Sequence, residues 1–132
     1  MDETKLKEIV ASSNFVIHDN TYVYAKVSSS PSIDDCFLIT KDKDEVTVVV
    51  TTENLDKVEL IERNKDDYKL IELKVSLPFY AVGFLAAVTK AISAKGCNNL
   101  IVSTYSKDYV FVRVEQLELA RKALLEAGFR EG

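Results

Sequence analysis

Residue types that often carry out chemistry are scarce in this sequence. It holds one histidine, His18, in the polar segment IHDNT, and two cysteines, Cys36 and Cys97, far apart in apolar runs. A lone imidazole with no second histidine or cysteine nearby predicts a surface or turn residue rather than a catalyst or metal ligand. The cysteine spacing fits neither a CxxC redox pair nor a zinc site, so both thiols are expected to be reduced and buried.

Nucleotide-binding and nucleophilic motifs are also missing from the sequence. Only four glycines occur, and neither a GxGxxG nor a GxxxxGK[ST] pattern is present. Residues 41–45, KDKDE, offer carboxylates to a hard cation, but the interleaved lysines favour a solvated hairpin instead. The serines have no adjacent base that would activate them. We therefore predict no catalytic residue, no bound metal and no cofactor, and hence a protein that is not an enzyme.

A binding site is the chemistry that the residues do support. If residues 70–76 form a strand and a helix begins at Gly83, unpaired helix N–H groups point into the connection between them. Those donors and the helix dipole favour an anion such as the carboxylate of an amino acid, and Gly83 lets the backbone approach it closely. The alternative is that Gly83 only relieves crowding at a tight turn.

The elements around this connection are expected to be strand, helix, two strands and helix. Alternation predicts strands at residues 70–76, 98–104 and 109–114, and helical spacing predicts helices at 83–95 and from 117 to Gly128. This order is most of a ferredoxin-like unit. Residues 128–132 are too few for its last strand, so we expect that strand to come from the N-terminal half.

The N-terminal half predicts the same kinds of element with weaker patterns. We expect a helix at residues 3–13, strands at 22–27, 36–40 and 45–50, and a short helix at 53–58 capped by Thr51 or Thr52. The polar run 62–69, ERNKDDYK, marks the boundary, which gives an N-terminal half at 1–64 and a second domain at 65–132. The expected fold class is α+β, with two interlocked ferredoxin-like halves and antiparallel sheets.

Composition limits the partners. The 132 residues carry a net charge of −4 with a sequence pI near 5.1, which lacks the basic surplus that nucleic-acid binding needs. No apolar run is long enough to span a membrane, and the first residues do not read as a signal peptide. We expect a cytoplasmic protein that contacts neither nucleic acid nor membrane.

Residues 70–129 resemble the ACT domain, a regulatory module that binds small molecules, usually amino acids. The aliphatic-glycine pair Val82-Gly83 matches the strand-to-helix loop of that family, and residues 98–103 match the strand that faces it. Residues 103–109, STYSKDY, are similar to a motif of the paired ACT units in cytosolic arginine sensors, whose aspartate lies near the ligand. The resemblance implies a ligand-binding set of Ser76, Val82, Gly83, Phe84, Asn98, Asn99, Ile101, Ser103, Thr104 and Asp108.

The resemblance implies a non-catalytic regulatory module that binds an amino acid and assembles as a homodimer. Asp108 is the residue expected to meet a cationic group, unless it only bonds its own backbone in a hairpin turn. This chain departs from the family at residues 77–80, LPFY, which are bulkier and more apolar. If Phe79 and Tyr80 fill the pocket, the alternative is an interaction protein that docks a partner through its sheet edge or helices.

Overall fold

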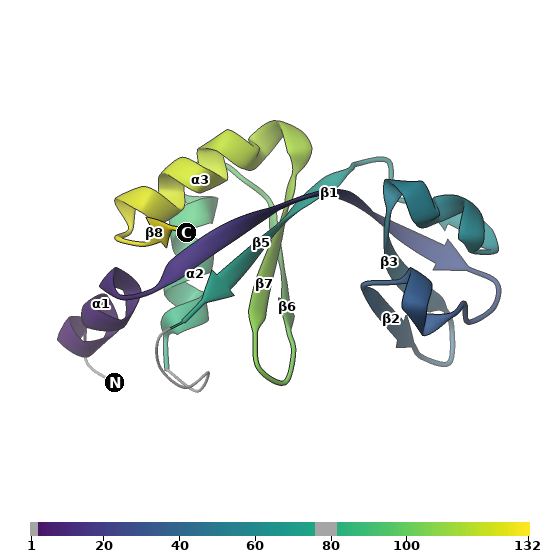
Figure 1. Ribbon diagram of the computed structural model, residues 1–132, viewed down its shortest axis with the longest axis horizontal. Helices are drawn as coiled ribbons and strands as arrows, with labels where there is room; N and C mark the ends of the chain where they lie inside the picture. The colour runs from purple at the N-terminus through teal and green to yellow at the C-terminus, as the bar shows by residue number, and fades with distance from the viewer. Residues whose placement is uncertain (1–2, 76–81) are drawn as a thin grey trace. The chain divides into compact units, whose positions relative to one another are not determined.

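The computed structural model describes residues 3–75 and 82–132 of the chain (Figure 1). They form two compact units. The first unit combines Met1–His18 with Lys69–Gly132, and the second unit is Asp19–Tyr68. This grouping differs from the boundary expected between residues 64 and 65, because the first 18 residues pack with the C-terminal elements.

The first unit has a ferredoxin-like arrangement of strands. Its sheet has the order β1-β5-β7-β6, and the short β8 pairs in parallel with β1. No helix in the described part of the chain is long and apolar enough to cross a bilayer. The elements are α1 (Glu3–Ala11), the start of β1 (Asn14–Val27), β5 (Tyr68–Lys74), α2 (Phe84–Ser93), β6 (Asn99–Ser103), β7 (Asp108–Arg113), a 3-10 turn at Val114–Gln116, α3 (Leu117–Glu126) and β8 (Arg130–Glu131).

All three helices of the first unit pack on a single core. Alternation along β5 turns Ile71 and Leu73 toward the helices, and both are buried. The ring of Phe84 at the start of α2 meets that of Phe129 edge to face, with centroids 5.8 Å apart. The other buried members of this core are Ile9, Val10, Phe15, Val88, Ile92, Cys97, Val110, Val112, Ala120, Ala123 and Leu124.

The strand that the C-terminal half lacks is supplied by β1, as the sequence predicted. However, β1 begins at Asn14, eight residues earlier than expected, and takes the sheet position beside β5. The last residues form a short additional strand, in which Arg130 and Glu131 pair with Asn14 and Phe15, but the fourth strand of the unit is β1, as expected. Two residues are enough here because the strand extends an existing sheet edge.

The second unit repeats the same strand order. Its elements are the rest of β1, β2 (Leu38–Lys41), β3 (Val46–Thr51) and β4 (Leu60–Arg63), with 3-10 turns at Ile33–Asp35 and Thr52–Lys57. The order is β2-β3-β1-β4, and all of these pairings are antiparallel. Both units therefore place their strands as a ferredoxin-like unit does, with 3-10 turns standing where the first unit has helices.

The core of the second unit is small and contains mostly valine. Ala25, Val27, Val48 and Val50 form its buried cluster. The helix expected at residues 53–58 is a 3-10 turn, and Thr51 makes no side-chain cap hydrogen bond to it. A turn of six residues cannot bury the apolar stripe that stabilises an α-helix, so its contribution to the core is limited to Leu55 and Val58.

We expect Phe15→Ala to destabilise the protein by about 3–5 kcal/mol, the usual cost of emptying a buried phenylalanine site. Phe15 is fully buried, and it lies in the strand that completes the first unit's sheet. Tyr105→Ala is the matched control, since that ring is 83% exposed and its removal leaves no cavity. Urea unfolding of both variants measures the effect, and equal losses would refute the role assigned to β1.

Candidate functional site

The candidate site lies at one end of the first unit. There β5 and β6 end, α2 begins, and the turn between β6 and β7 projects, at the lower edge of Figure 1. β7 lies between β5 and β6 in the sheet, and β6 pairs with it in antiparallel orientation. In the chain, α2 connects the end of β5 to the start of β6, so β5 and β6 run in the same direction. The carboxyl ends of two strands and the amino end of a helix are thereby brought to one end of the sheet.

Gly83 is the residue that precedes α2, and its backbone requires glycine. Its φ is +86°, in the left-handed region that other residues adopt only with strain. A Cβ at this position would lie 3.6 Å from Cδ2 of Leu6, an ordinary contact, so backbone conformation and not crowding selects glycine. Gly83 has no side chain that could cap the helix, and the N–H groups of the first turn of α2 have no partners inside the helix.

The turn between β6 and β7 is held by side-chain hydrogen bonds. The hydroxyl of Ser103 donates to Oδ1 of Asp108 at 2.6 Å, and Asp108 is 7% exposed. Across the turn, the Thr104 N–H donates to the Lys107 carbonyl at 2.8 Å, and the Lys107 N–H donates to the Thr104 hydroxyl at 3.2 Å. The Asp108 carboxylate is therefore fixed in position by the side chain of the residue paired with it across the hairpin.

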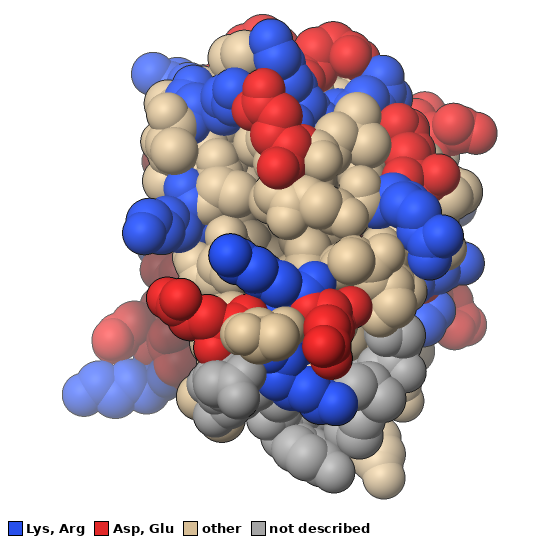
Figure 2. All heavy atoms as spheres, turned by 90° about the vertical axis from the view of Figure 1, so that its left-hand side faces the viewer, with Lys and Arg blue, Asp and Glu red and all other residues tan. Residues whose placement is uncertain are grey.

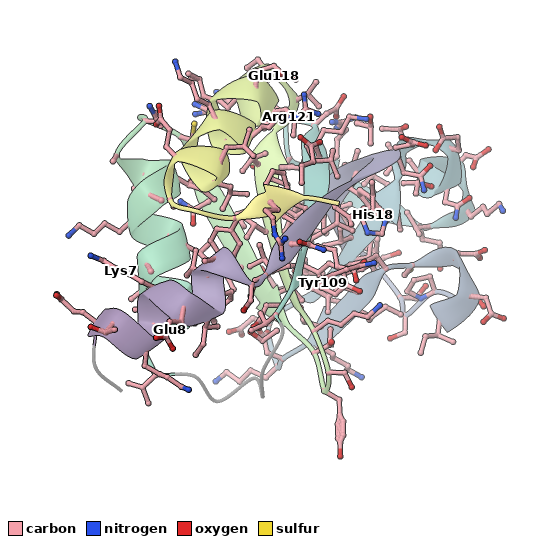
Figure 3. All side chains as sticks on the ribbon, turned by 60° about the vertical axis from the view of Figure 1, so that its left-hand side comes forward. Lys7, Glu8, His18, Tyr109, Glu118 and Arg121 are labelled. Atoms are coloured by element: carbon pink, nitrogen blue, oxygen red, sulfur yellow. The ribbon has the colours of Figure 1, made fainter. Side chains whose placement is uncertain are left out.

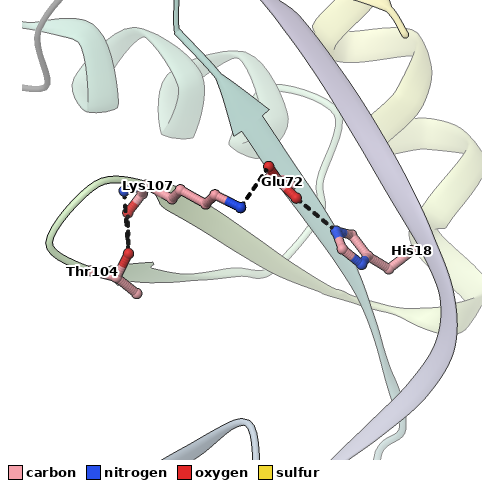
Figure 4. A network of polar contacts seen from close by, with 4 residues as sticks. All are labelled: His18, Glu72, Thr104 and Lys107. Atoms are coloured by element: carbon pink, nitrogen blue, oxygen red, sulfur yellow. Dashed lines mark hydrogen bonds and ion pairs between the residues drawn. The ribbon is translucent and has the colours of Figure 1, made fainter.

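Next to this turn, Glu72 of β5 binds two basic side chains (Figure 4). His18 Nε2 lies 3.0 Å from Oε1 of Glu72, and Lys107 Nζ lies 3.4 Å from Oε2. Burial acts to raise the pKa of Glu72, but the hydrogen bonds from His18 and Lys107 outweigh it and hold the pKa below its usual value. The network connects β1, β5 and the hairpin turn.

Two sequence interpretations are corrected by this network. His18 is not a turn residue: it lies within β1, half-buried, with its ring 6.4 Å from that of Tyr109 (Figure 3). The alternation of residues 70–76 would put Glu72 on the face opposite Ile71 and Leu73, where a polar side chain is expected to be solvated, but Glu72 is buried. The sequence does not reveal the contact between His18 and Glu72, because the two residues are 54 positions apart. The aspartate and asparagine that follow His18 and the alternation of β5 give no sign of it.

A shallow cavity of about 320 Å³ opens beside the same network. Its lining comes from β5 and the hairpin turn, namely Glu72, Leu73, Lys74, Val75, Ser106 and Lys107. The volume is at the lower end of what small-molecule sites use. Among residues 3–75 and 82–132, no three His, Cys, Asp or Glu side chains group as a metal site.

The structure brings only part of the expected ligand-binding set together. Val82, Gly83, Ser103, Thr104 and Asp108 lie at the end of the unit described above. Phe84 is 3% exposed and its ring packs in the core. Ser76 lies outside the described residues, as do Phe79 and Tyr80.

Asn98 and Asn99 lie at the opposite end of β6. Asn99 is the first of the five residues of β6, about 13 Å along the strand from Ser103, where the hairpin turn begins. The Asn98 N–H donates to Oε1 of Gln116, and the Asn99 side chain donates to the Ser93 hydroxyl. Ile101, halfway along, packs against the core. The ligand-binding set expected from the sequence omitted His18, Glu72, Lys107 and Tyr109, which lie near the hairpin turn. The length of the strand expected at residues 98–104 was the one signal that Asn98 and Asn99 lie apart from that turn.

We expect Glu72→Gln to lower the free energy of unfolding by about 1.5–3 kcal/mol at neutral pH, the range for hydrogen bonds to charged groups. A carboxyl whose pKa is lower in the folded state stabilises that state above its unfolded pKa and stops doing so as the pH falls through the folded pKa. The difference between wild type and variant should therefore shrink well below pH 4.5, the usual value for glutamate.

Chemical unfolding at neutral and acidic pH measures this difference. Glu8→Gln is the control, because Glu8 is exposed on α1 (Figure 3) and its loss should change little at either pH. A destabilisation by Glu72→Gln that stays the same at both pH values would show that shape, not charge, accounts for it.

Comparisons with known proteins give one family and several structures. Residues 64–126 match the ACT domain. No curated protein matches the chain. A Vibrio cholerae protein of unknown function, described as a possible transport protein, is 23% identical with a TM-score of 0.80, covering 95% of this chain and 97% of that one.

Two further structures are similar over most of their length. A protein from Agrobacterium tumefaciens is 20% identical with a TM-score of 0.74, covering 91% of this chain and 92% of that one. The ligand-free regulatory subunit of aspartate kinase from Thermus thermophilus is 13% identical with a TM-score of 0.62, covering 89% and 98%. The chain thus has the ferredoxin-like, ACT-type fold of these structures, and residues 64–126 are the part that matches the ACT domain itself.

Proposed function

We propose that the protein is a non-catalytic regulatory module that binds a small molecule, with amino acids as the ligand class. The observation that carries the proposal is the start of α2 after the left-handed Gly83, which lies at the same end of the unit as the buried Asp108. The match of residues 64–126 to the ACT domain supports it, as does the likeness to a subunit that is itself named regulatory.

The two groups suit the carboxylate and a cationic side chain of an amino acid. Free N–H groups and the positive end of the helix dipole favour a carboxylate at Gly83. Asp108 offers an acceptor for a cationic group, and Ser103 already orients its carboxylate. The ligand would act by linkage: it stabilises whichever conformation or assembly binds it more tightly, and no bond is made or broken.

Self-association as a homodimer is the second part of the proposal. β6 is the last strand of the first unit's sheet, so one row of its backbone groups pairs with no strand in the described part of the chain. Ile101 faces the core, so Leu100 and Val102, both half-buried, lie on the opposite face of β6. An exposed edge with apolar side chains favours pairing with a second copy, and two-fold dimers are the commonest closed assembly.

The function from a different class is an interaction protein whose pocket is closed. The same free edge of β6 favours it, since a partner strand could be added there without any ligand. A thermal-shift screen of the twenty amino acids separates the two functions, because a ligand that binds only the folded protein raises its melting temperature.

For a ligand found in that screen, we expect Gly83→Val to abolish binding. Valine places a branched side chain where the ligand would meet the backbone, and the positive φ adds a strain of about 1–3 kcal/mol. Gly96→Val is the matched control: Gly96 follows the opposite end of α2 with φ +80° and nothing within 4 Å of an added Cβ. It should cost similar stability and leave binding intact.

Calorimetry on both variants checks the result. Unchanged affinity in Gly83→Val would place the ligand elsewhere and refute the site. Asp108→Asn should weaken only ligands with a cationic side chain, by about 2–5 kcal/mol if the pair is desolvated. Ser103→Ala is the comparison variant, since it removes the hydroxyl that orients the Asp108 carboxylate and keeps the carboxylate itself.

We expect Val102→Lys to shift the protein from dimer to monomer, because a lysine on an edge strand opposes edge-to-edge pairing. Thr40→Lys, on the exposed β2 of the second unit, is the control at a different sheet edge. Light scattering at tens of micromolar, roughly the range of a specific interface, measures the mass. A wild-type mass near the 14.8 kDa of one chain would contradict the dimer.

A further inference from the structure

A groove on the helical side of the first unit is separate from the site described above. It encloses about 360 Å³ where α1 crosses α2 and the end of α3, and this side of the unit is turned toward the viewer in Figure 2. Its lining combines an apolar floor with charged side chains on the rim, namely Leu6, Val10, Ala87 and Ala127 on the floor and Glu3, Lys7 and Lys90 on the rim.

The spacing along the helices explains why these side chains converge. Leu6 and Val10 are four residues apart on α1, and Glu3 and Lys7 are likewise four apart, so all share one side of the helix. Ala87 and Lys90 are three apart on α2. Small side chains at residues 87 and 127 leave the space open, since larger ones would fill it.

Charge on the rim selects the kind of molecule that fits. Two lysines and one glutamate give the rim a formal charge of +1, although the whole chain carries −4. Neither Lys7 nor Lys90 has an ion pair with another described residue, and Lys7 projects from α1 near the start of α2 (Figure 3). A ligand that fits this groove therefore combines an anionic group, which the two lysines bind, with an apolar part that covers the floor.

We propose that this groove binds a monocarboxylic acid with a short apolar tail, its carboxylate at Lys7 and Lys90 and its tail on Leu6 and Val10. The tail removes apolar surface from water, which favours binding in proportion to the area covered. The two ammonium groups supply charge-assisted hydrogen bonds to the carboxylate. The volume suits a small ligand. Because the groove contains neither Gly83 nor Asp108, this inference does not depend on the proposed function.

The test uses hexanoate as the probe on the full chain, with acetate and hexylammonium as the comparison compounds. Amide chemical shifts in the NMR spectrum should move for residues 6, 10 and 87 with hexanoate, and the affinity should exceed that of both comparison compounds at least tenfold. Acetate lacks the tail, and hexylammonium carries the wrong charge. Equal affinity for the three, or shifts confined to other residues, would overturn the proposal.

Two kinds of variant test the two parts of the groove. Lys7→Met with Lys90→Met keeps the apolar stems, removes both charges and should weaken hexanoate at least tenfold, whereas Lys5→Met on the same helix, outside the groove lining, should not. Ala87→Leu, at a half-exposed position, should fill the groove and abolish binding while the melting temperature stays close to wild type. Undiminished binding in either variant would refute the groove as the site. Asp108→Asn, which changes no residue of the groove lining, should leave hexanoate binding intact, and this distinguishes the groove from the site at the start of α2.

Discussion

The structure depends on one strand, β1, whose 14 residues from Asn14 to Val27 serve both units. In the first unit its beginning takes the position of a ferredoxin-like fourth strand beside β5. In the second unit its remainder is the central strand, paired with β3 on one side and β4 on the other. Neither sheet is complete without it, and a unit of about 60 residues is marginally stable at best. The sharing of β1 therefore predicts that the two ferredoxin-like units depend on each other for folding.

The sequence predicted the C-terminal elements better than the N-terminal ones for a physical reason. In β5, alternation is regular because Ile71 and Leu73 face a core built by three helices. In the second unit no α-helix packs on the buried cluster of Ala25, Val27, Val48 and Val50, so a weaker apolar pattern suffices and the connecting turns stay 3-10. The beginning of β1 was missed because Asp19 and Asn20 are exposed within the strand. A polar segment reads as a turn unless its pairing partner, distant in sequence, is known.

The helical period of residues 83–95 located α2 and hence the position of Gly83 before it. A left-handed Gly96 is usual after the end of a helix, but a left-handed Gly83 could not be predicted, because the residue before a helix ordinarily has an extended backbone. The expected grouping of Asn98 and Asn99 with Gly83 is not found in the structure, because the two ends of a strand of five residues lie far from each other. The Glu72 network could not be predicted from the sequence, since its three members come from β1, β5 and a hairpin turn.

This network also gives the candidate site a physical connection to the shared strand. Lys107 belongs to the same turn as Asp108, while His18 belongs to β1, and both bind the Glu72 carboxylate. A ligand that rearranged the turn would change the Lys107 contact and thereby the charge balance around Glu72. Since Glu72 is buried, an altered balance costs more than it would in water. A ligand bound at the turn would therefore be linked to the pairing of β1 with β5 through one carboxylate, and such linkage acts equally in both directions.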